Sequence, residues 1–265
     1  LAVQVLPLSN PLRSAEEACM MDQISLGRFD YGVGRSGITK FYNGYNVPYD
    51  ESRARFDESL DIIMTAFNNE TFSYEGQFYS FQDVTVAPAP VQQPHPPVWV
   101  ATAAPESFPA LGKRGFPILL WFQGNWFEEP LKEYRKAWKE AGHPGDPQAL
   151  LRIPAYVGET PERAREEPRE STLHDFRRLA REYGEAGDEQ RATRATYDLE
   201  HYDEVLKTRL AYGSHEEMTE QLQEFRERMG VTGFLFDLNF GGQLPQELVL
   251  NSMRLLSEKV MPVFK

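Results

Sequence analysis

A glycine-rich segment near the N-terminus is the first candidate for chemistry. The segment GRFDYGVGRSG, residues 27–37, contains three glycines in the spacing G-x-G-x-x-G, the last of them Gly37. This spacing is typical of turns that hold a dinucleotide pyrophosphate on the first amides of a helix. Such a turn needs a helix directly after the glycines, and here the next expected helix begins at about Ser52. We therefore interpret the segment as a strand end whose glycines let the backbone approach a ligand.

Two arginines near this strand end could bind an anion. Arg35 would project from the C-terminal end of the strand, which is the catalytic face of a barrel. Arg53 lies in the first turn of the next expected helix, where a cation opposes the helix dipole. A phosphate between the two guanidinium groups would remove that conflict. The residues alone favour the alternative, a surface ion pair of Arg53 with Asp50 or Asp57.

Composition limits the function classes. The chain has 265 residues, a formal charge of −12 and one cysteine. The acidic balance argues against nucleic acid as a partner, because nonspecific binding needs a basic surface. A single cysteine excludes an intramolecular disulfide and points to a reducing, cytoplasmic compartment. No apolar run is long enough for a membrane span. The chain opens in an apolar run without an initiator methionine, so we expect it to begin inside a larger protein.

The order of elements predicts an α/β fold. Apolar runs typical of strands alternate with helical stretches about six times. The expected strands are LAVQVL, FDYGVG, VWVAT, PILLW, LLRIPAYVG and GFLFDLNF, and FSYEGQFYSF is an expected hairpin. Alternation of this kind indicates a parallel sheet with helices outside, either an open doubly wound sheet or an eight-stranded barrel. We expect one domain over residues 1–265, with a charged insertion of helices and loop at about 160–212.

Five stretches, spread from end to end, resemble the luciferase-like flavin monooxygenases, the family of bacterial luciferase (alkanal monooxygenase). They are VLPLSNPLRSAEE, MDQISLGRFDYGVGRSG, ESRARFDE, VWVATAAPES and GVTGFLFDLNFGGQLPQELVLNSMRLLSEKVMPVF. The resemblance implies a TIM-type (β/α)8 barrel that lacks its N-terminal strands. It also implies an FMNH2-dependent monooxygenase that takes reduced FMN from a flavin reductase. With O2, such an enzyme would oxidise a small apolar substrate such as an aldehyde.

The resemblance assigns the flavin phosphate to residues of this chain. The family holds that phosphate with an arginine after the fourth strand, an arginine at the start of the next helix, and the loop after the fifth strand. These positions are Arg35, Arg53 and the loop from Thr102 to Ser107, with Ser107 at a phosphate-binding threonine position. The resemblance therefore favours the phosphate site over the surface ion pair. The family's catalytic histidine would lie upstream of Leu1, so the catalytic residue is unknown.

The chain departs from bacterial luciferase around this site. The loop carries Ala103, Ala104 and Pro105 where luciferase has an acidic residue and a serine, so amides could donate but a hydroxyl is lost. Gly34 replaces a cysteine near the flavin ring and would leave more room there. The family's non-proline cis peptide beneath the ring would fall at Ala2–Val3. The cofactor site therefore includes Val3 and Gly34 by resemblance alone.

Two alternatives to the monooxygenase stay open. The same fold also carries deazaflavin (F420)-dependent oxidoreductases, which move hydride without oxygen. The absent histidine favours a noncatalytic flavin-binding or partner subunit, provided that the chain is complete. By resemblance, the helix from Pro11 to Ile24 lies near a dimer interface, so we expect a homodimer.

The remaining candidates have plainer interpretations. The five histidines show no metal-ligand spacing; they are His95, His143, His174, His201 and His215. Cys19 is expected in the core of a helix. Gly241 and Gly242 are interpreted as a turn before the last helix rather than a phosphate loop. A group of aromatic residues after a strand end could equally wall an apolar substrate pocket or fill the core; it comprises Trp121, Phe122, Trp126 and Phe127.

Overall fold

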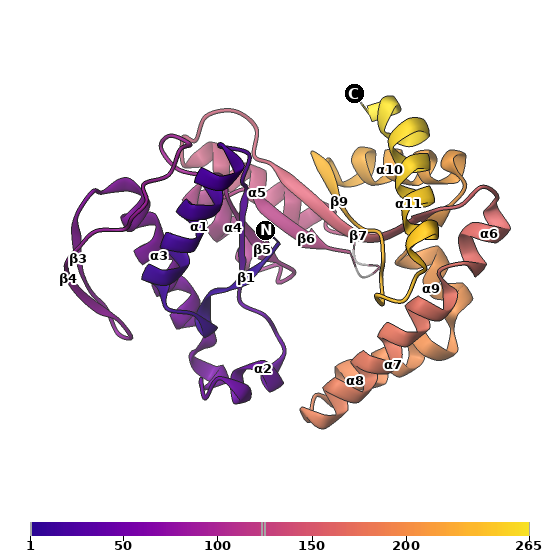
Figure 1. Cartoon of the computed structure of the whole chain (residues 1–265), viewed down its shortest axis with the longest axis horizontal. Helices are drawn as coiled ribbons and strands as arrows, with labels where there is room; N and C mark the ends of the chain where they lie inside the picture. The colour runs from indigo at the N-terminus through magenta and orange to yellow at the C-terminus, as the bar shows by residue number, and fades with distance from the viewer. Residues whose placement is uncertain (1, 123, 125, 265) are drawn as a thin grey trace. The chain divides into compact units, whose positions relative to one another are not determined.

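The computed structural model describes residues 2–122, 124 and 126–264 (Figure 1). Cα packing divides the chain into two compact units. The first unit comprises residues 1–102 and 116–118, and the second comprises residues 103–115 and 119–265. Each unit has its own elements and its own core, and the single domain expected over residues 1–265 stays a prediction.

Three parallel strands form the centre of the first unit. β1 (Gln4–Val5) pairs with β2 (Tyr31–Gly34), and β2 pairs with β5 (Val98–Thr102). Every residue of β2 is buried, as expected for a strand flanked on both sides in a parallel sheet. The parallel sheet expected from the sequence is thus present around β2.

Helices α1 (Pro11–Ser25) and α3 (Ser52–Asn68) pack against each other beside these strands. The side chain of Asn10 accepts hydrogen bonds from the first amides of α1, and the following proline suits the first turn. The apolar stripe of α3 is buried as the helical period predicts, at Phe56, Leu60, Ile63 and Phe67.

The expectation that no helix begins before about Ser52 is wrong. A short helix, α2 (Thr39–Gly44), begins soon after β2, and a 3-10 turn (Tyr49–Glu51) leads into α3. No side chain caps α2. Its fully buried Tyr42 packs edge-on against Tyr49 at a centroid distance of 5.1 Å. Tertiary packing of one aromatic side chain therefore stabilises a helix that local sequence signals do not mark.

Two carboxylates fasten loops of the first unit to its helices. Glu58 of α3 accepts hydrogen bonds from three consecutive amides between β3 (Phe72–Glu75) and β4 (Ser80–Val84), the expected antiparallel hairpin. The fully buried Asp22 of α1 accepts from the amides of Val91 and Gln92 at 2.7 and 2.8 Å. Charge-assisted bonds of this kind are among the stronger ones in proteins.

The second unit is built around the long strand β7 (Ala149–Val157). It pairs in parallel with β8 (Ala211–Gly213) and with β9 (Gly233–Asp237). Residues of β6 (Ile118–Trp121) precede Phe122, whose amide donates to the carbonyl of Arg152 in β7 at 2.9 Å. The described strands of neither unit close into a barrel by themselves.

Eight helices of the second unit are described: α4 (Ser107–Arg114), α5 (Glu128–Glu140), α6 (Pro161–Glu166), α7 (Arg169–Glu185), α8 (Glu189–Glu200), α9 (Tyr202–Thr208), α10 (His215–Met229) and α11 (Gln246–Leu255). The charged segment at about 160–212 thus folds into α6–α9, with α7 and α8 side by side (Figure 1). Contrary to the expectation of solvent-facing helices, Leu173, Phe176 and Tyr202 are buried in one apolar cluster with Tyr156 of β7.

An ion pair joins α8 to the segment that enters β8. Asp198 of α8 and Arg209 lie 2.5 Å apart, with side-chain exposures of 5% and 11%. Arg194, one turn earlier in α8, places its Nε 3.3 Å from the same carboxylate, but its side chain is 59% exposed. The buried pair therefore depends on Arg209 far more than on Arg194.

Replacing Asp22 should destabilise the first unit. Asp22→Ala leaves the amides of Val91 and Gln92 and the Gln92 side chain without their acceptor, so the free energy of unfolding should fall by about 2 kcal/mol. Urea denaturation of purified protein measures this. Glu16→Ala is the matched control on α1, because Glu16 makes only an exposed i,i+3 pair with Arg13, and it should cost less than about 0.5 kcal/mol. Equal losses for the two variants would contradict the anchoring role of Asp22.

Replacing Arg209 should destabilise the second unit. Arg209→Met leaves the buried Asp198 with one mostly exposed partner, so the loss should be about 3 kcal/mol. Arg194→Met touches the same carboxylate but removes an exposed cation, and it should cost less than about 1 kcal/mol. Thermal and urea unfolding compare the two variants directly, and a larger effect at Arg194 would be inconsistent with the burial of this pair.

Candidate functional site

The strand end at Gly34 is packed too closely for a side chain. A Cβ atom on Gly34 would lie 2.9 Å from Cγ2 of Val3 and 3.4 Å from Cβ of Ala101. Glycine therefore permits the approach of these neighbours, as the strand-end interpretation requires. The room expected from the missing cysteine side chain is taken up in part by Val3. The Ala2–Val3 peptide bond is cis, as the resemblance implied.

Arg35 runs from this strand end to the start of α3. Its Nη1 donates a hydrogen bond to Oγ of the buried Ser52 at 2.9 Å. Its carbonyl accepts a hydrogen bond from the hydroxyl of Tyr42, whose pKa burial raises to about 12 although the charge of Arg35 opposes the rise. Arg53 is exposed in the first turn of α3, one residue after Ser52. The structure thus brings both arginines to the N-terminal end of the same helix.

The expected phosphate loop lies across the division of the chain. Thr102 ends β5 in the first unit, whereas Ala103, Ala104 and Ser107 belong to the second. The amide of Ser107 donates to the carbonyl of Ala104 at 2.9 Å, at the start of α4. Its hydroxyl, rather than its amide, is therefore the group that suits a ligand. Assembly of this loop with Arg35 and Arg53 stays a prediction.

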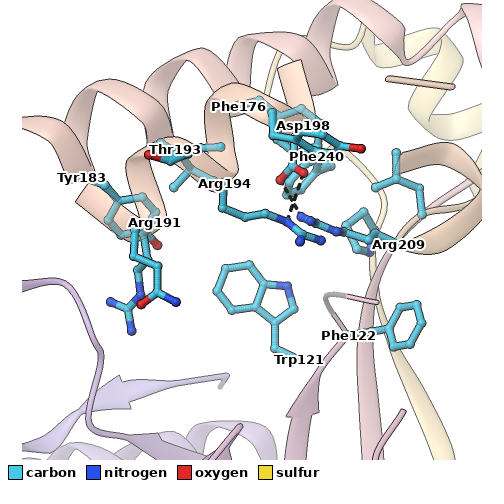
Figure 2. Close-up of a pocket in the computed structure, with 16 residues that line it drawn as sticks. Trp121, Phe122, Phe176, Tyr183, Arg191, Thr193, Arg194, Asp198, Arg209 and Phe240 are labelled. Atoms are coloured by element: carbon cyan, nitrogen blue, oxygen red, sulfur yellow. Dashed lines mark hydrogen bonds and ion pairs between the residues drawn. The ribbon is translucent and has the colours of Figure 1, made fainter. Parts of the chain in front are cut away.

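A cavity of about 550 Å³ lies within the second unit, and we call it the Trp121 cavity (Figure 2). Its apolar lining includes Trp121, Phe122, Phe176, Leu179, Leu210 and Phe240. A volume and lining of this kind suit a small organic ligand. The four aromatic residues at the end of β6 and after it have different roles. Trp121 and Phe122 line the cavity, and Trp126 packs on Phe122 and Phe225. Phe127 is buried in the core and stacks on Phe108 at a centroid distance of 5.8 Å.

One wall of the Trp121 cavity is charged. Arg194, Asp198 and Arg209 line it, and Figure 2 shows both guanidinium groups beside the carboxylate. Burial raises the pKa of Asp198 to about 6, while the charge of Arg194 opposes the rise. The adjacent Arg209 lies 2.5 Å from the same carboxylate, so its charge also favours the ionised form of Asp198. In that form the cluster carries two cations and one anion.

A second ion pair lies near the same tryptophan. Arg152 of β7 and Asp237 at the end of β9 are 2.6 Å apart and about one-third exposed. The guanidinium carbon of Arg152 lies 5.0 Å from the centroid of the Trp121 ring. The sequence interpretation missed these five charged residues. The sequence pattern that could have indicated this charged group is the i,i+4 spacing of Arg194 and Asp198. Ordinary ion pairs on the surface of a helix have the same spacing.

The structure also describes the surroundings of the other candidate residues. The described residues include no cluster of three or more His, Cys, Asp or Glu suited to a metal ion. Cys19 is fully buried, and burial raises its pKa to about 11, as expected for an inert core thiol. Gly241 and Gly242 both have positive φ and form a turn against Ser171 of α7. Among the described helices, none has the length and apolar character needed to cross a membrane.

Curated proteins of similar sequence match parts of the chain. A protein of Sinorhizobium fredii named y4wF is 38% identical over 40% of this chain and 31% of its own length. The oxygenase component of flavin-dependent trigonelline monooxygenase from Acinetobacter baylyi is 36% identical over 39% of this chain and 29% of its own length. The alkanal monooxygenase beta chain of Photorhabdus luminescens is 30% identical over 62% of this chain and 52% of its own length. The matched stretches thus span about half of these relatives or less.

Solved structures of similar fold cover almost the whole chain. Monooxygenase RslO1 from Streptomyces bottropensis superposes with a TM-score of 0.81 at 26% identity, over 100% of this chain and 77% of its own. The oxygenating constituent of 3,6-diketocamphane monooxygenase from Pseudomonas putida, in complex with FMN, gives 0.77 at 19% identity, over 98% of this chain and 78% of its own. The F420-dependent tetrahydromethanopterin reductase from Methanopyrus kandleri gives 0.74 at 16% identity, over 97% and 80%.

These neighbours support the α/β, TIM-type class of fold expected from the sequence. The family model described as luciferase-like monooxygenase matches residues 1–233, which is most of the chain. The chain therefore belongs to the luciferase-like monooxygenase family.

Proposed function

We propose that this chain is the oxygenating part of a two-component, FMNH2-dependent monooxygenase. It would use O2 to oxidise a small, largely apolar substrate such as an aldehyde. The observation that carries the proposal is Arg35, which reaches from the glycine end of β2 to Ser52 at the start of α3. Together with Arg53 it places two guanidinium groups where a helix N-terminus already favours an anion.

The residues of the candidate site fit a flavin phosphate. Arg35 and Arg53 would hold its oxygens as charged donors, which is the chemistry that guanidinium forks provide. The loop after β5 would complete the binding of the phosphate. Its donors would be the side chains of Thr102 and Ser107 and the amides of Ala103 and Ala104. Reduced FMN, when bound, supplies the electrons for reaction with O2.

The rest of the binding site would orient the ring and exclude water. Gly34 and Val3 form the packed surface at the strand end, against which the flavin ring would lie. The Trp121 cavity, with its aromatic walls, would hold the apolar body of the substrate and keep water from it. The group that moves protons in the reaction stays unassigned, because the family's histidine has no counterpart among these residues.

The proposed partners are a flavin reductase, O2 and a second copy of the chain. The relative from Acinetobacter baylyi is named as an oxygenase component, which supports a separate source of reduced flavin. The C-terminal part of α1 exposes several large apolar side chains, which support a homodimer interface there; they are Met20, Met21, Ile24 and the adjacent Leu26. We propose a cytoplasmic location from the cysteine usage.

Two other functions have some support. Several structural neighbours are named for F420, so a deazaflavin could occupy the same fold. A noncatalytic flavin-binding subunit would keep the arginines but not turn over. Anaerobic titration with reduced FMN and reduced F420, followed by addition of O2 and a long-chain aldehyde, separates the three. The monooxygenase binds FMNH2 and converts the aldehyde to its carboxylic acid, the deazaflavin enzyme prefers F420, and the subunit binds flavin without forming this product.

Removing the two arginines should weaken flavin binding. Arg35→Ala combined with Arg53→Ala should raise the Kd for FMN at least tenfold, because two charged donors to the phosphate are lost. Riboflavin, which has no phosphate, should bind the variant and the parent protein equally. Fluorescence titration measures both ligands.

Arg28→Ala is the control for this double variant. Arg28 is exposed just before β2, at the opposite end of the strand from Arg35. Its loss changes the net charge without touching the proposed site, so the FMN affinity should stay the same. Unchanged FMN affinity in the Arg35/Arg53 variant would remove the phosphate assignment.

A further inference from the structure

We propose that the Trp121 cavity binds an organic acid, with a carboxylate on the arginine wall and an apolar body against the aromatic wall. This inference rests on the proposed function in one respect: the bound acid is taken to be the molecule that is oxidised. It adds one carboxylate to the largely apolar substrate of the proposed function, which makes that substrate an amphipathic monocarboxylate.

The charge of the cavity is opposite to that of the chain. The protein carries a formal charge of −12, but three arginines and one carboxylate line the Trp121 cavity: Arg191, Arg194, Arg209 and Asp198. Arg191 lies 3.4 Å from Asp188, which reduces its contribution. The remaining three groups leave one net positive charge on this wall, carried by the partly solvated Arg194, beside the aromatic lining of the cavity.

Arg194 has donors to spare. Its Nε faces Asp198 at 3.3 Å, and its two terminal nitrogens have no hydrogen-bond partner among the described residues. A carboxylate can accept two parallel hydrogen bonds from such a fork. Arg209 adds a second cation to the same wall. Its Nη1 donates a hydrogen bond to Asp198, and its buried Nε has no hydrogen-bond partner in the described part of the chain.

The opposite wall suits a hydrocarbon or aromatic body. Figure 2 shows the Trp121 ring below the guanidinium groups of Arg194 and Arg209, and Phe122 and Phe240 are also among the lining residues. An apolar group gains free energy when it leaves water for such a surface. Because the cavity has both arginine and aromatic walls, it should bind an organic acid more tightly than an inorganic anion, which has no apolar body.

A purely structural role explains only part of the cluster. The buried pair of Asp198 and Arg209 joins α8 to the entry of β8 and needs no ligand. Arg194 is different, because it is 59% exposed and adds a second cation to a carboxylate that already has one. Exposed pairs contribute little stability, so Arg194 could turn to a ligand while the buried pair of Asp198 and Arg209 stays intact.

The test uses benzoate, benzamide and inorganic phosphate as probes, titrated calorimetrically into the flavin-free protein. Benzoate should bind at least tenfold more tightly than the isosteric neutral benzamide, and phosphate should bind more weakly than benzoate. Arg194→Gln should lower the affinity for benzoate at least fivefold and leave the affinity for benzamide unchanged. The benzoate affinity of Arg194→Lys should lie between those of the parent protein and Arg194→Gln. Arg177→Gln is the matched control, because Arg177 is an exposed arginine of α7 that pairs with Glu170 outside the cavity lining.

Several results would overturn the proposal. These are equal affinities for benzoate and benzamide, no binding of either, equal effects of the Arg194 and Arg177 variants, or phosphate binding as tightly as benzoate. FMN titrations of the same proteins separate this test from that of the proposed function. Arg194→Gln should keep its FMN affinity, and the Arg35/Arg53 variant should keep its benzoate affinity, so either assignment can fail alone.

Discussion

Parallel pairing of β2 with its neighbours is the constraint on which the candidate flavin site depends. The carboxyl ends of parallel strands meet at one edge of a sheet, so Gly34 at the end of β2 and Thr102 at the end of β5 lie at the same edge of the first unit's sheet. Gly34 lets the neighbouring chain approach this edge, and Arg35 follows directly. A one-residue shift in register would move Arg35 to the other face of the sheet. Helix α3, which comes after α2, then has to lie so that its N-terminus meets this arginine.

That placement is secured by polar anchors rather than by the strands alone. Asp22 binds the amides of Val91 and Gln92, and Gln92 also donates to the carbonyl of Phe29 just before β2. Tyr42 ties α2 to the backbone of Arg35. The bonds of Asp22 and Gln92 connect segments 63 to 70 residues apart. Arg35 itself is held by Tyr42 and Ser52, which lie 7 and 17 residues further along the chain, so its orientation depends on how the segment from β2 to α3 folds.

The sequence could predict those features that depend on local periodicity and known motifs. The stripe of α3, the hairpin and the parallel strands follow from spacing, and the cis bond at Ala2–Val3 followed from family resemblance. Helix α2 could not be predicted, because a buried tyrosine and not a cap stabilises it. The charged wall of the Trp121 cavity could not be predicted either. Arg209 lies eleven residues from Asp198, and only the path through α9 brings the two together.

The charge of this wall sets what the cavity can hold. The carboxylate of Asp198 pairs with Arg209 and so balances one arginine of the wall, which leaves the charge of Arg194. A ligand with a single negative charge would complete the balance, whereas a dianion would exceed it and a neutral ligand would leave a cation facing aromatic walls. Charge pairs gain strength as water leaves a site, so the same apolar surface that binds the body of an acid also strengthens its carboxylate contact. Recognition of the acid and exclusion of water therefore depend on each other in this cavity.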